Sequence, residues 1–225
     1  MCGRFTLRAS ASAIAEQFSL FELPELPPRY NIAPSQPVAV VRRRPQSGDD
    51  QRQLVLMRWG LIPSWATDPA IGNRLANARS ESVMEKPAFR AAMGRRRCLI
   101  PADGFYEWKK NGRNKQPYLI GLRDGRLFAF AGLWEAWEGA DHSYVESCTI
   151  LTTTPNELMA PIHDRMPVIL PAEAYGPWLD PAVPPAEVLA WLRPLPADRM
   201  TAYPVGTVVN NPRNDRPECV APLVP

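Results

Sequence analysis

Proline is the feature that most constrains this sequence, because it accounts for 26 of the 225 residues. This is more than twice the usual share of about 5%. Each proline fixes φ and removes a backbone hydrogen-bond donor, so such a chain is unsuited to a helical bundle and favours strands joined by stiff loops. The hydrophobic share of 45% is nevertheless enough for a sizeable core, which excludes wholesale disorder.

The apolar pattern predicts short helices between a longer series of strands. Ile14 and Phe18 lie four residues apart behind serines, as on one face of a short amphipathic helix. This first helix is expected over residues 11–20, and further helices are expected over residues 87–94, 156–160, 172–179 and 185–192. The segment Ser82-Val83-Met84-Glu85 has the capping-box pattern in front of the second helix, which Pro87 would open.

Strands are expected where short apolar runs are bounded by turn residues: over residues 38–43, 53–59, 98–101, 104–110, 117–122, 126–134, 145–153 and 168–170. A polar turn is expected over residues 46–52, and Asn111-Gly112 supplies a tight turn. No repeat or long linker divides the chain. The sequence therefore predicts one α+β domain over residues 1–225, with a mainly antiparallel, barrel-like β-sheet core and short surrounding helices.

Composition argues against several classes of protein. The longest apolar run, Leu127 to Trp134, is far shorter than the roughly 18 residues of a membrane span, so no membrane partner is expected. The first residues lack the apolar core of a signal peptide, which predicts a cytoplasmic protein. A net charge of +3 is too small to establish a nucleic-acid partner, although scattered arginines leave room for a basic patch.

Cysteine and histidine are sparse and widely spaced. No Cys-x-x-Cys pair is present, and the residues concerned are Cys2, Cys98, Cys148, Cys219, His142 and His163. Neither a zinc site nor a disulfide framework is therefore expected. Cys98 and Cys148 stand in apolar runs and are interpreted as core residues, whereas His142 is expected in an exposed turn.

Cys2 differs from the other cysteines because of its position. Removal of Met1, which is common before a small residue, would leave an α-amine and a thiol on adjacent carbons. Their reference pKa values are about 8 and 8.5, so both nucleophiles are available near neutral pH. Such a 1,2-aminothiol can condense with an aldehyde to an imine and close it to a thiazolidine, or attack an acyl group as a hydrolase does. An incidental cysteine is the plainer alternative.

Two further residues have a chemical and a structural interpretation. Strand alternation places Glu107 on the face of Phe105, opposite Tyr106 and Trp108. A carboxylate among aromatic side chains has a raised pKa and suits general acid–base catalysis, but an edge-strand glutamate paired with lysine fits equally well. His163, between a helical segment and a strand, could shuttle a proton, although a lone loop histidine is more often structural.

Two motifs have features of a nucleic-acid surface. Asn77 and Arg79 precede a helix and could hold an anion there, or they could be a turn residue and a surface charge. Trp59 and Trp65 surround a turn, where one could stack on a nucleobase; Trp59 is expected in the core.

Taken together, six motifs resemble the SOS-response-associated peptidase family of abasic-site-processing proteins. They occur in the family's order from residue 2 to the strand after His163: Met1-Cys2-Gly3-Arg4-Phe5, Arg29-Tyr30-Asn31-Ile32-Ala33-Pro34, Trp59-Gly60, Asn77-Ala78-Arg79-Ser80-Glu81, Ala102-Asp103-Gly104-Phe105-Tyr106-Glu107-Trp108 and Ile162-His163-Asp164-Arg165-Met166-Pro167.

This resemblance implies a sensor of abasic sites that binds single-stranded DNA and crosslinks itself to the lesion during the DNA damage response. Matching positions make Cys2 the nucleophile, with Asn77, Glu107 and His163 completing the catalytic site. The positions matched to DNA contacts are Arg4, Arg79 and Arg165 near the backbone, and Pro34, Trp65 and Trp108 against bases. Ala66 departs from members that carry a second tryptophan there. No metal or organic cofactor is implied.

The implied chemistry is a thiazolidine crosslink between Cys2 and the open-ring aldehyde, with lyase-like imine formation and peptidase activity limited to removal of residues ahead of Cys2. Glu107 would move a proton during imine formation, and His163 would exchange one with the ring oxygen O4′. The implied partner is single-stranded DNA with abasic sites, and junctions between single and double strands are a further possible substrate. The protein is expected to be a monomer and to associate with the nucleoid when it is bound to damaged DNA. An N-terminal-nucleophile cysteine peptidase and a noncovalent single-stranded DNA-binding module remain as alternatives.

Overall fold

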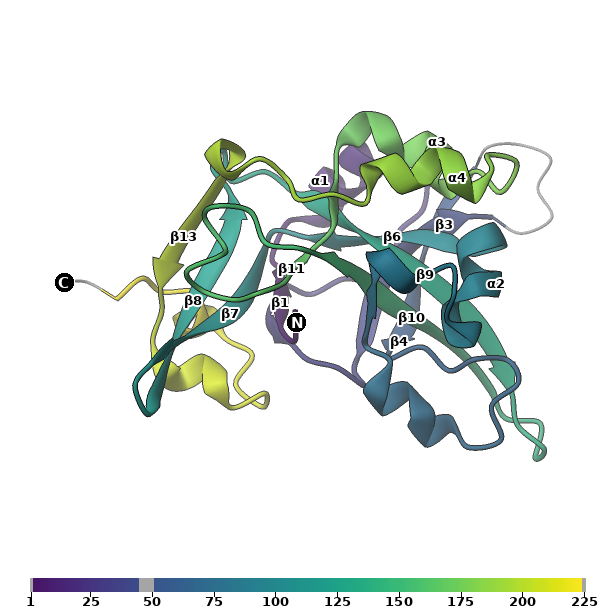
Figure 1. The fold of residues 1–225 in the computed structure, drawn as a ribbon, viewed down its shortest axis with the longest axis horizontal. Helices are drawn as coiled ribbons and strands as arrows, with labels where there is room; N and C mark the ends of the chain where they lie inside the picture. The colour runs from purple at the N-terminus through teal and green to yellow at the C-terminus, as the bar shows by residue number, and fades with distance from the viewer. Residues whose placement is uncertain (1, 45–50, 224–225) are drawn as a thin grey trace.

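The strands of the chain divide between two sheets that meet around a shared hydrophobic core (Figure 1). The computed structural model describes residues 2–44 and 51–223. Five strands of the larger sheet close on themselves in the order β10-β4-β3-β6-β9-β10: β3 (Pro37–Arg43), β4 (Arg52–Trp59), β6 (Arg97–Ala102), β9 (Phe128–Glu138) and β10 (Tyr144–Thr153). The β10–β4 pair is parallel and the others are antiparallel, so the core is a closed five-stranded mixed barrel.

Three short strands extend the barrel next to the candidate site. They are β5 (Asn77–Arg79), parallel to β10, and the antiparallel β11 (Met166–Pro167) and β12 (Ile169–Leu170). β10 therefore pairs with β5, which contains Asn77, and with β11, which follows His163 in the chain.

The second sheet is antiparallel and contains the N-terminal strand. Its order is β13 (Met200–Pro204), β8 (Asn114–Leu122), β7 (Gly104–Asn111), β1 (Phe5–Leu7) and β2 (Arg29–Ile32). Phe5 of β1 packs edge-on against Trp59 and Phe130, with ring centroids 5.2 and 5.7 Å apart. The start of the chain is therefore anchored against the barrel.

Four short α-helices lie around the sheets: α1 (Ala11–Phe18), α2 (Pro87–Arg95), α3 (Tyr175–Leu179) and α4 (Pro185–Val188), within the described part of the chain. Ser10 caps α1 by accepting a hydrogen bond from the Ala13 amide, and Ile14 and Phe18 are buried as expected. Pro87 takes the first position of α2, also as expected.

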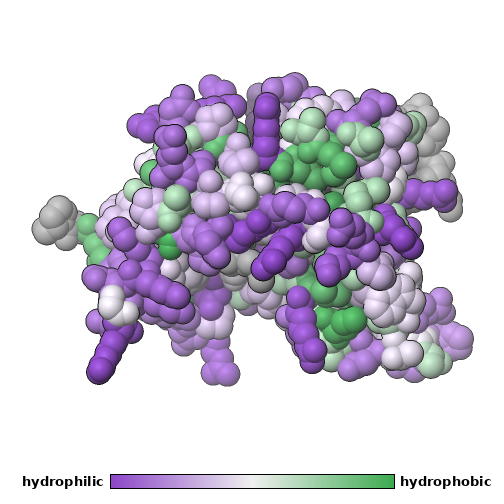
Figure 2. All heavy atoms as spheres, in the orientation of Figure 1, coloured by the Kyte–Doolittle hydropathy of each residue, from purple (hydrophilic) through white to green (hydrophobic). Residues whose placement is uncertain are grey.

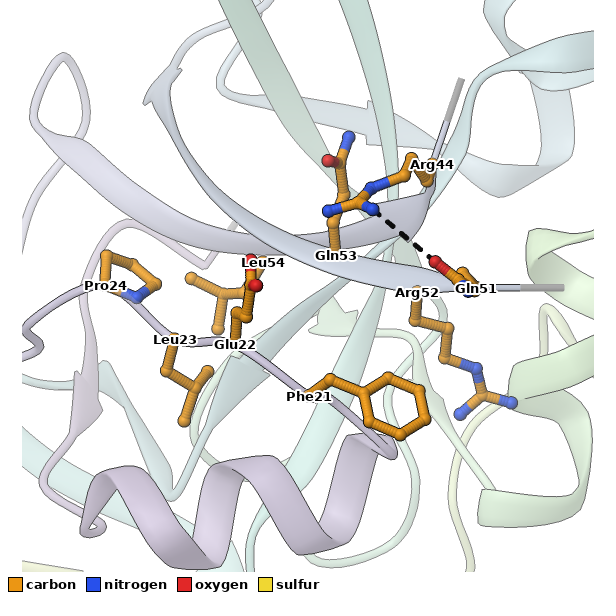
Figure 3. A pocket seen from close by; sticks show the side chains of 9 residues that line it. All are labelled: Phe21, Glu22, Leu23, Pro24, Arg44, Gln51, Arg52, Gln53 and Leu54. Atoms are coloured by element: carbon orange, nitrogen blue, oxygen red, sulfur yellow. Dashed lines mark hydrogen bonds between the residues drawn. The ribbon is translucent and has the colours of Figure 1, made fainter. Parts of the chain in front are cut away.

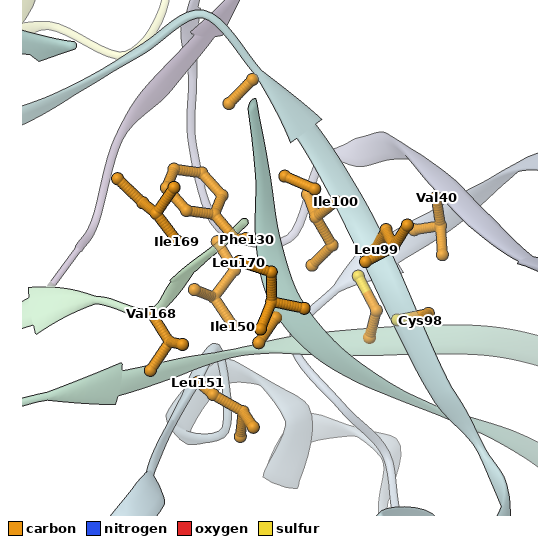
Figure 4. Close-up of a cluster of buried hydrophobic side chains, with 14 of the residues drawn as sticks. Val40, Cys98, Leu99, Ile100, Phe130, Ile150, Leu151, Val168, Ile169 and Leu170 are labelled. Atoms are coloured by element: carbon orange, nitrogen blue, oxygen red, sulfur yellow. The ribbon is translucent and has the colours of Figure 1, made fainter. Parts of the chain in front are cut away.

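The barrel interior is filled by aliphatic and aromatic side chains, among them Val40, Ile100, Phe130 and Ile150 (Figure 4). Cys98 and Cys148 are fully buried, which confirms their interpretation as core residues. In the space-filling view, hydrophilic residues cover much of one face and hydrophobic patches interrupt them (Figure 2). No helix of the described residues is long and apolar enough to cross a membrane.

The predicted α+β class and barrel-like core are confirmed, and individual elements differ in detail. Residues 156–160 form a turn instead of a helix, because Pro161 has no amide hydrogen to donate to the Glu157 carbonyl and so cannot continue a helix. The segment 82–85 does not act as a capping box, since α2 begins after Lys86 without a side-chain cap. Residues 46–50 of the expected turn lie outside the described residues. The expected helices at 172–179 and 185–192 combine the 3₁₀ turns Ala172–Ala174 and Leu189–Trp191 with α3 and α4.

Candidate active site

Cys2 lies in the interior, just ahead of β1. Its side chain is fully buried, and its carbonyl oxygen accepts a hydrogen bond of 2.8 Å from Asn77 Nδ2. The Tyr106 amide donates to the Arg4 carbonyl at 2.9 Å, so the segment before β1 runs beside β7. Burial raises the pKa of the Cys2 thiol, and the nearby Glu107 charge adds to this effect. The thiolate fraction expected for a free aminothiol is therefore suppressed here, and Cys2 needs a base to become a nucleophile.

Glu107 lies on β7, where the alternation expected from the sequence is observed. Phe105 packs toward the barrel with its ring centroid 6.1 Å from that of Phe130, while Tyr106 and Trp108 share the opposite face. Only 3% of Glu107 is exposed, so its carboxyl group is shielded from solvent. Burial raises the pKa of Glu107 to about 7. The carboxyl can thus give or take a proton near neutral pH.

His163 follows the turn at residues 157–162 and faces Glu107 from across the site. Its Nε2 atom lies 3.8 Å from Glu107 Oε2. At the other ring nitrogen, the Arg165 amide donates a hydrogen bond of 3.0 Å to Nδ1, and Asp164 Oδ1 lies 2.9 Å away. Burial lowers the pKa of His163. The two candidate proton carriers are therefore adjacent, although they are far apart in the sequence.

Asn77 holds the start of the chain against the barrel. β5 holds it opposite Ile150 of β10, and its Nδ2 atom binds the Cys2 carbonyl. Its Oδ1 atom is buried without a hydrogen-bond partner among the described residues. A buried acceptor of this kind is available to a donor on a bound molecule.

A groove with a cavity volume of about 470 Å³ begins at Asn77. It is lined by Trp65, Leu75, Asn77, Ala78, Arg79, Ser82, Lys86, Pro87, Ala88 and Phe89. Trp65 is 59% exposed, and the guanidinium of the exposed Arg79 has no hydrogen-bond partner in the described part of the chain. The groove therefore presents an aromatic face and cationic side chains beside Asn77.

The loop that carries Trp65 is fixed at both ends. Trp137 Nε1 donates a hydrogen bond of 2.7 Å to the Ala66 carbonyl. Gly60 adopts φ +131°, and a Cβ atom there would lie 2.5 Å from the Gly72 oxygen, so only glycine permits this close approach. Sequence reasoning missed the groove residues Lys86 and Phe89; the signal that could have found them is their place at the start of α2.

Arg4 and Trp108 lie together beside the C-terminal segment. Arg4 Nη1 donates hydrogen bonds to Asn31 Oδ1 at 3.0 Å and to the Val209 carbonyl at 2.8 Å, and its guanidinium lies 5.8 Å from the Trp108 ring centroid. Trp108 Nε1 donates to Asn210 Oδ1 at 2.7 Å. These contacts hold β1 and β7 to residues 209–210. A DNA phosphate would have to share or replace the Arg4 hydrogen bonds.

The other two predicted DNA contacts flank the site from different elements. Arg165 forms a bidentate ion pair with Glu81, with both N···O distances 2.8 Å, and donates to the Thr152 carbonyl at 2.7 Å. Pro34 is half-buried and precedes Ser35, whose positive φ of 72° turns the chain after β2. Glu81, which no sequence argument singled out, is thus the direct partner of a predicted DNA contact.

A second cavity, of about 480 Å³, lies between the segment after α1 and the ends of β3 and β4 (Figure 3). Phe21, Arg44 and Arg52 are among its lining residues, and none of the predicted site residues contributes to it. In the described residues, no group of three or more histidine, cysteine or acidic side chains could hold a metal ion.

The pKa of Glu107 makes the stability of the protein depend on pH. Because folding raises this pKa from 4.5 to about 7, the folded state binds an extra proton between these values, and stability falls as the pH rises through this window. Glu107→Gln stays neutral, so above this window it should be more stable than the original protein by up to about 3 kcal/mol. Urea unfolding from about pH 4 to about pH 8 measures this. The exposed Glu85→Gln serves as control, and a pH slope unchanged in Glu107→Gln would contradict the assignment.

Comparison with known proteins assigns the family. A model of the SOS response associated peptidase (SRAP) family matches residues 1–212. The abasic site processing protein YoqW of Bacillus subtilis (strain 168) is 47% identical over 225 residues, covering 98% of this chain and 99% of YoqW. The abasic site processing protein HMCES of Xenopus tropicalis is 37% identical over 227 residues, covering 88% of this chain and 67% of HMCES.

A solved structure has the same fold over its whole length. It is a crystal structure of a protein from Bacteroides thetaiotaomicron, with a TM-score of 0.88 and 27% sequence identity, covering 99% of this chain and 100% of that one. The six motifs, the barrel and the relatives agree, and the chain belongs to the SOS response associated peptidase (SRAP) family.

Proposed function

We propose that the protein processes abasic sites in single-stranded DNA and crosslinks itself to them through Cys2, once Met1 has been removed. The family and the names of the relatives support abasic-site processing. The observation that carries the finer proposal is the convergence of the buried Cys2, held by Asn77, with Glu107 and its 3.8 Å neighbour His163.

The proposed reaction begins when the abasic sugar opens from hemiacetal to aldehyde. The Cys2 amine adds to C1′, and the resulting carbinolamine loses its hydroxyl as water to give an imine. The Cys2 sulfur then adds to the imine carbon while the nitrogen takes up a proton, which closes a thiazolidine ring. One water molecule is released overall. Closure removes the imine, whose persistence would allow β-elimination and strand cleavage.

Glu107 and His163 transfer different protons in this scheme. Glu107, with its pKa near 7, protonates the departing hydroxyl and accepts the proton of the Cys2 thiol. His163 gives a proton to O4′ when the sugar opens and takes it back when the ring closes again. Asn77 holds the Cys2 carbonyl, which orients the nucleophile, and its buried Oδ1 can accept a hydrogen bond from the sugar or from the Cys2 amine.

The groove beside Asn77 supports binding of single-stranded DNA. Trp65 offers an exposed ring for stacking, and Arg79 offers a guanidinium for a phosphate. Pro34 and Trp108 are assigned to base contacts and Arg4 and Arg165 to the backbone, by their positions in the family motifs. Phosphate contacts carry no sequence information, so binding should be independent of sequence. We propose that the protein acts on this DNA as a monomer.

Arg79→Ala should weaken binding of single-stranded DNA and lower its dependence on salt. Each lost phosphate contact reduces the slope of log K against log salt by roughly 0.7 for single strands. Titrations at several salt concentrations measure this slope. Arg126→Ala, which removes a 79% exposed arginine outside the groove, is the matched control. If both variants keep the original slope, Arg79 does not contact the backbone.

Arg4→Ala should give the same fall in slope if Arg4 also contacts a phosphate. Because Arg4 already binds Asn31 and Val209, this variant should in addition lose thermal stability, unlike Arg79→Ala. Thermal unfolding of both variants separates the two effects. A stability loss without any change in salt slope would assign Arg4 a structural role alone.

Intact-mass measurement after mixing with DNA tests the proposed function directly. A single-stranded oligonucleotide with an abasic site should give a stable adduct at the summed mass minus one water. An oligonucleotide with a tetrahydrofuran analogue, which has no aldehyde, should give none. Binding without an adduct would favour the noncovalent DNA-binding module, and cleavage of peptides without an adduct would favour the cysteine peptidase.

A further inference from the structure

We infer that Asp164 is a positioning residue that controls which nitrogen of the His163 ring carries a proton. The inference deepens the proposed function and rests on it only for the kinetic consequence. Two contacts meet at one atom of the ring: the Arg165 amide donates to His163 Nδ1 at 3.0 Å, and Asp164 Oδ1 lies 2.9 Å from the same nitrogen.

These two contacts require different protonation states. A lone pair on Nδ1 accepts the Arg165 hydrogen bond, and the neutral ring then carries its proton on Nε2. A proton on Nδ1 instead donates to the Asp164 carboxylate. Nδ1 therefore has a partner in either state: the neutral Arg165 amide when it has a lone pair, and the charged Asp164 carboxylate when it carries a proton. The hydrogen bond to the carboxylate is the stronger of the two when the ring is positively charged.

The other charged groups around His163 do not replace Asp164. Glu107 approaches the opposite ring nitrogen, Nε2, at 3.8 Å. Burial lowers the pKa of His163 and the charge of Lys110 adds to this effect, whereas Asp164 raises the pKa. The Arg165 guanidinium is paired with Glu81. Asp164 is thus the carboxylate that favours a proton at Nδ1.

A proton at Nδ1 determines what Nε2 can do. When Asp164 holds that proton, Nε2 can release its own proton and take it back, as the exchange with O4′ requires. Without the carboxylate, the Arg165 amide remains and favours the ring with a lone pair on Nδ1. Nε2 then keeps its proton, and His163 loses its function as a base. Because the Asp164 side chain is 88% exposed, salt should screen its effect.

The chain offers a clean test because it contains two histidines, His163 and His142. Nuclear magnetic resonance of the ¹⁵N-labelled imidazoles follows both during a pH titration of the whole protein without DNA. Asp164→Asn should move the His163 midpoint to lower pH and shift its neutral form toward protonation at Nε2. The His142 ring signals serve as the internal reference. An unchanged His163 midpoint and unchanged Nδ1 and Nε2 shifts would overturn the inference.

Glu138→Gln is the matched control. Glu138 lies 3.4 Å from His142 Nδ1, so this variant also removes a carboxylate beside a histidine, but at an exposed place outside the site. It should leave the His163 titration unchanged. A similar His163 shift in Glu138→Gln would assign the effect to overall charge and overturn the role of Asp164.

The kinetic test uses the pH profile of crosslinking. In Asp164→Asn, the part of the rate–pH profile that follows the titration of His163 should move to lower pH. This displacement should be smaller at high salt. Crosslinking with an unmoved profile would overturn the inference while the proposed function stands. Failure of every variant to crosslink would overturn the proposed function, and the imidazole titration would still decide the inference.

Discussion

Cys2→Ala is expected to abolish the stable crosslink and to leave the affinity for single-stranded DNA nearly unchanged. The thiol is the atom that closes the thiazolidine, whereas the affinity arises from phosphate and base contacts. The α-amine at residue 2 can still form an imine, so strand nicking is the expected residual reaction. Denaturing electrophoresis and intact mass measure the crosslink, and a binding titration measures the affinity.

Cys98→Ala is the matched control for this variant, because it removes an equally buried thiol from the barrel core. Cys98→Ala should form the crosslink at the rate of the original protein under conditions where the variant is folded, although its stability should be modestly lower. If Cys2→Ala forms the stable adduct at an undiminished level, Cys2 is not the sulfur nucleophile and the thiazolidine scheme fails.

Glu107→Gln is expected to slow crosslink formation by about 10²–10⁴-fold, the usual contribution of a general acid–base group. The amide keeps the shape of the side chain but can neither protonate the departing hydroxyl nor accept the proton of the Cys2 thiol. Because burial raises the pKa of Glu107 to about 7, the acid form declines as the pH rises through this value, and so should the rate of the original protein. Time courses across this range measure both effects, and a variant with an unchanged rate would exclude Glu107 as the proton carrier.

His163→Ala separates the two proton transfers. It should slow both formation and reversal, because O4′ must receive a proton on opening and return it on closure. Release of the crosslinked DNA onto a competing abasic oligonucleotide measures reversal. Reversal at the original rate in this variant would show that His163 does not serve the sugar oxygen, even with Cys2 as nucleophile.

The sequence alone determined the class of fold and the identity of the candidate residues. Proline content and apolar runs predicted short strands around a barrel-like core, and the alternation around Glu107 correctly placed Phe105 and Tyr106 on opposite faces. These features are local: a period of two and a capping serine act within a few residues. The motifs likewise carried the family resemblance, which the comparisons confirm.

The tertiary structure alone decided how these residues meet. The parallel β10–β4 pair closes the barrel, and the parallel β10–β5 pair brings Asn77 to the Cys2 carbonyl. No local pattern encodes a pairing between strands so far apart in the sequence. Burial by these remote elements also sets the proton affinities of Cys2, Glu107 and His163, because desolvation depends on everything packed around a group. The sequence identified the candidate reacting groups, and the folded surroundings determine their protonation.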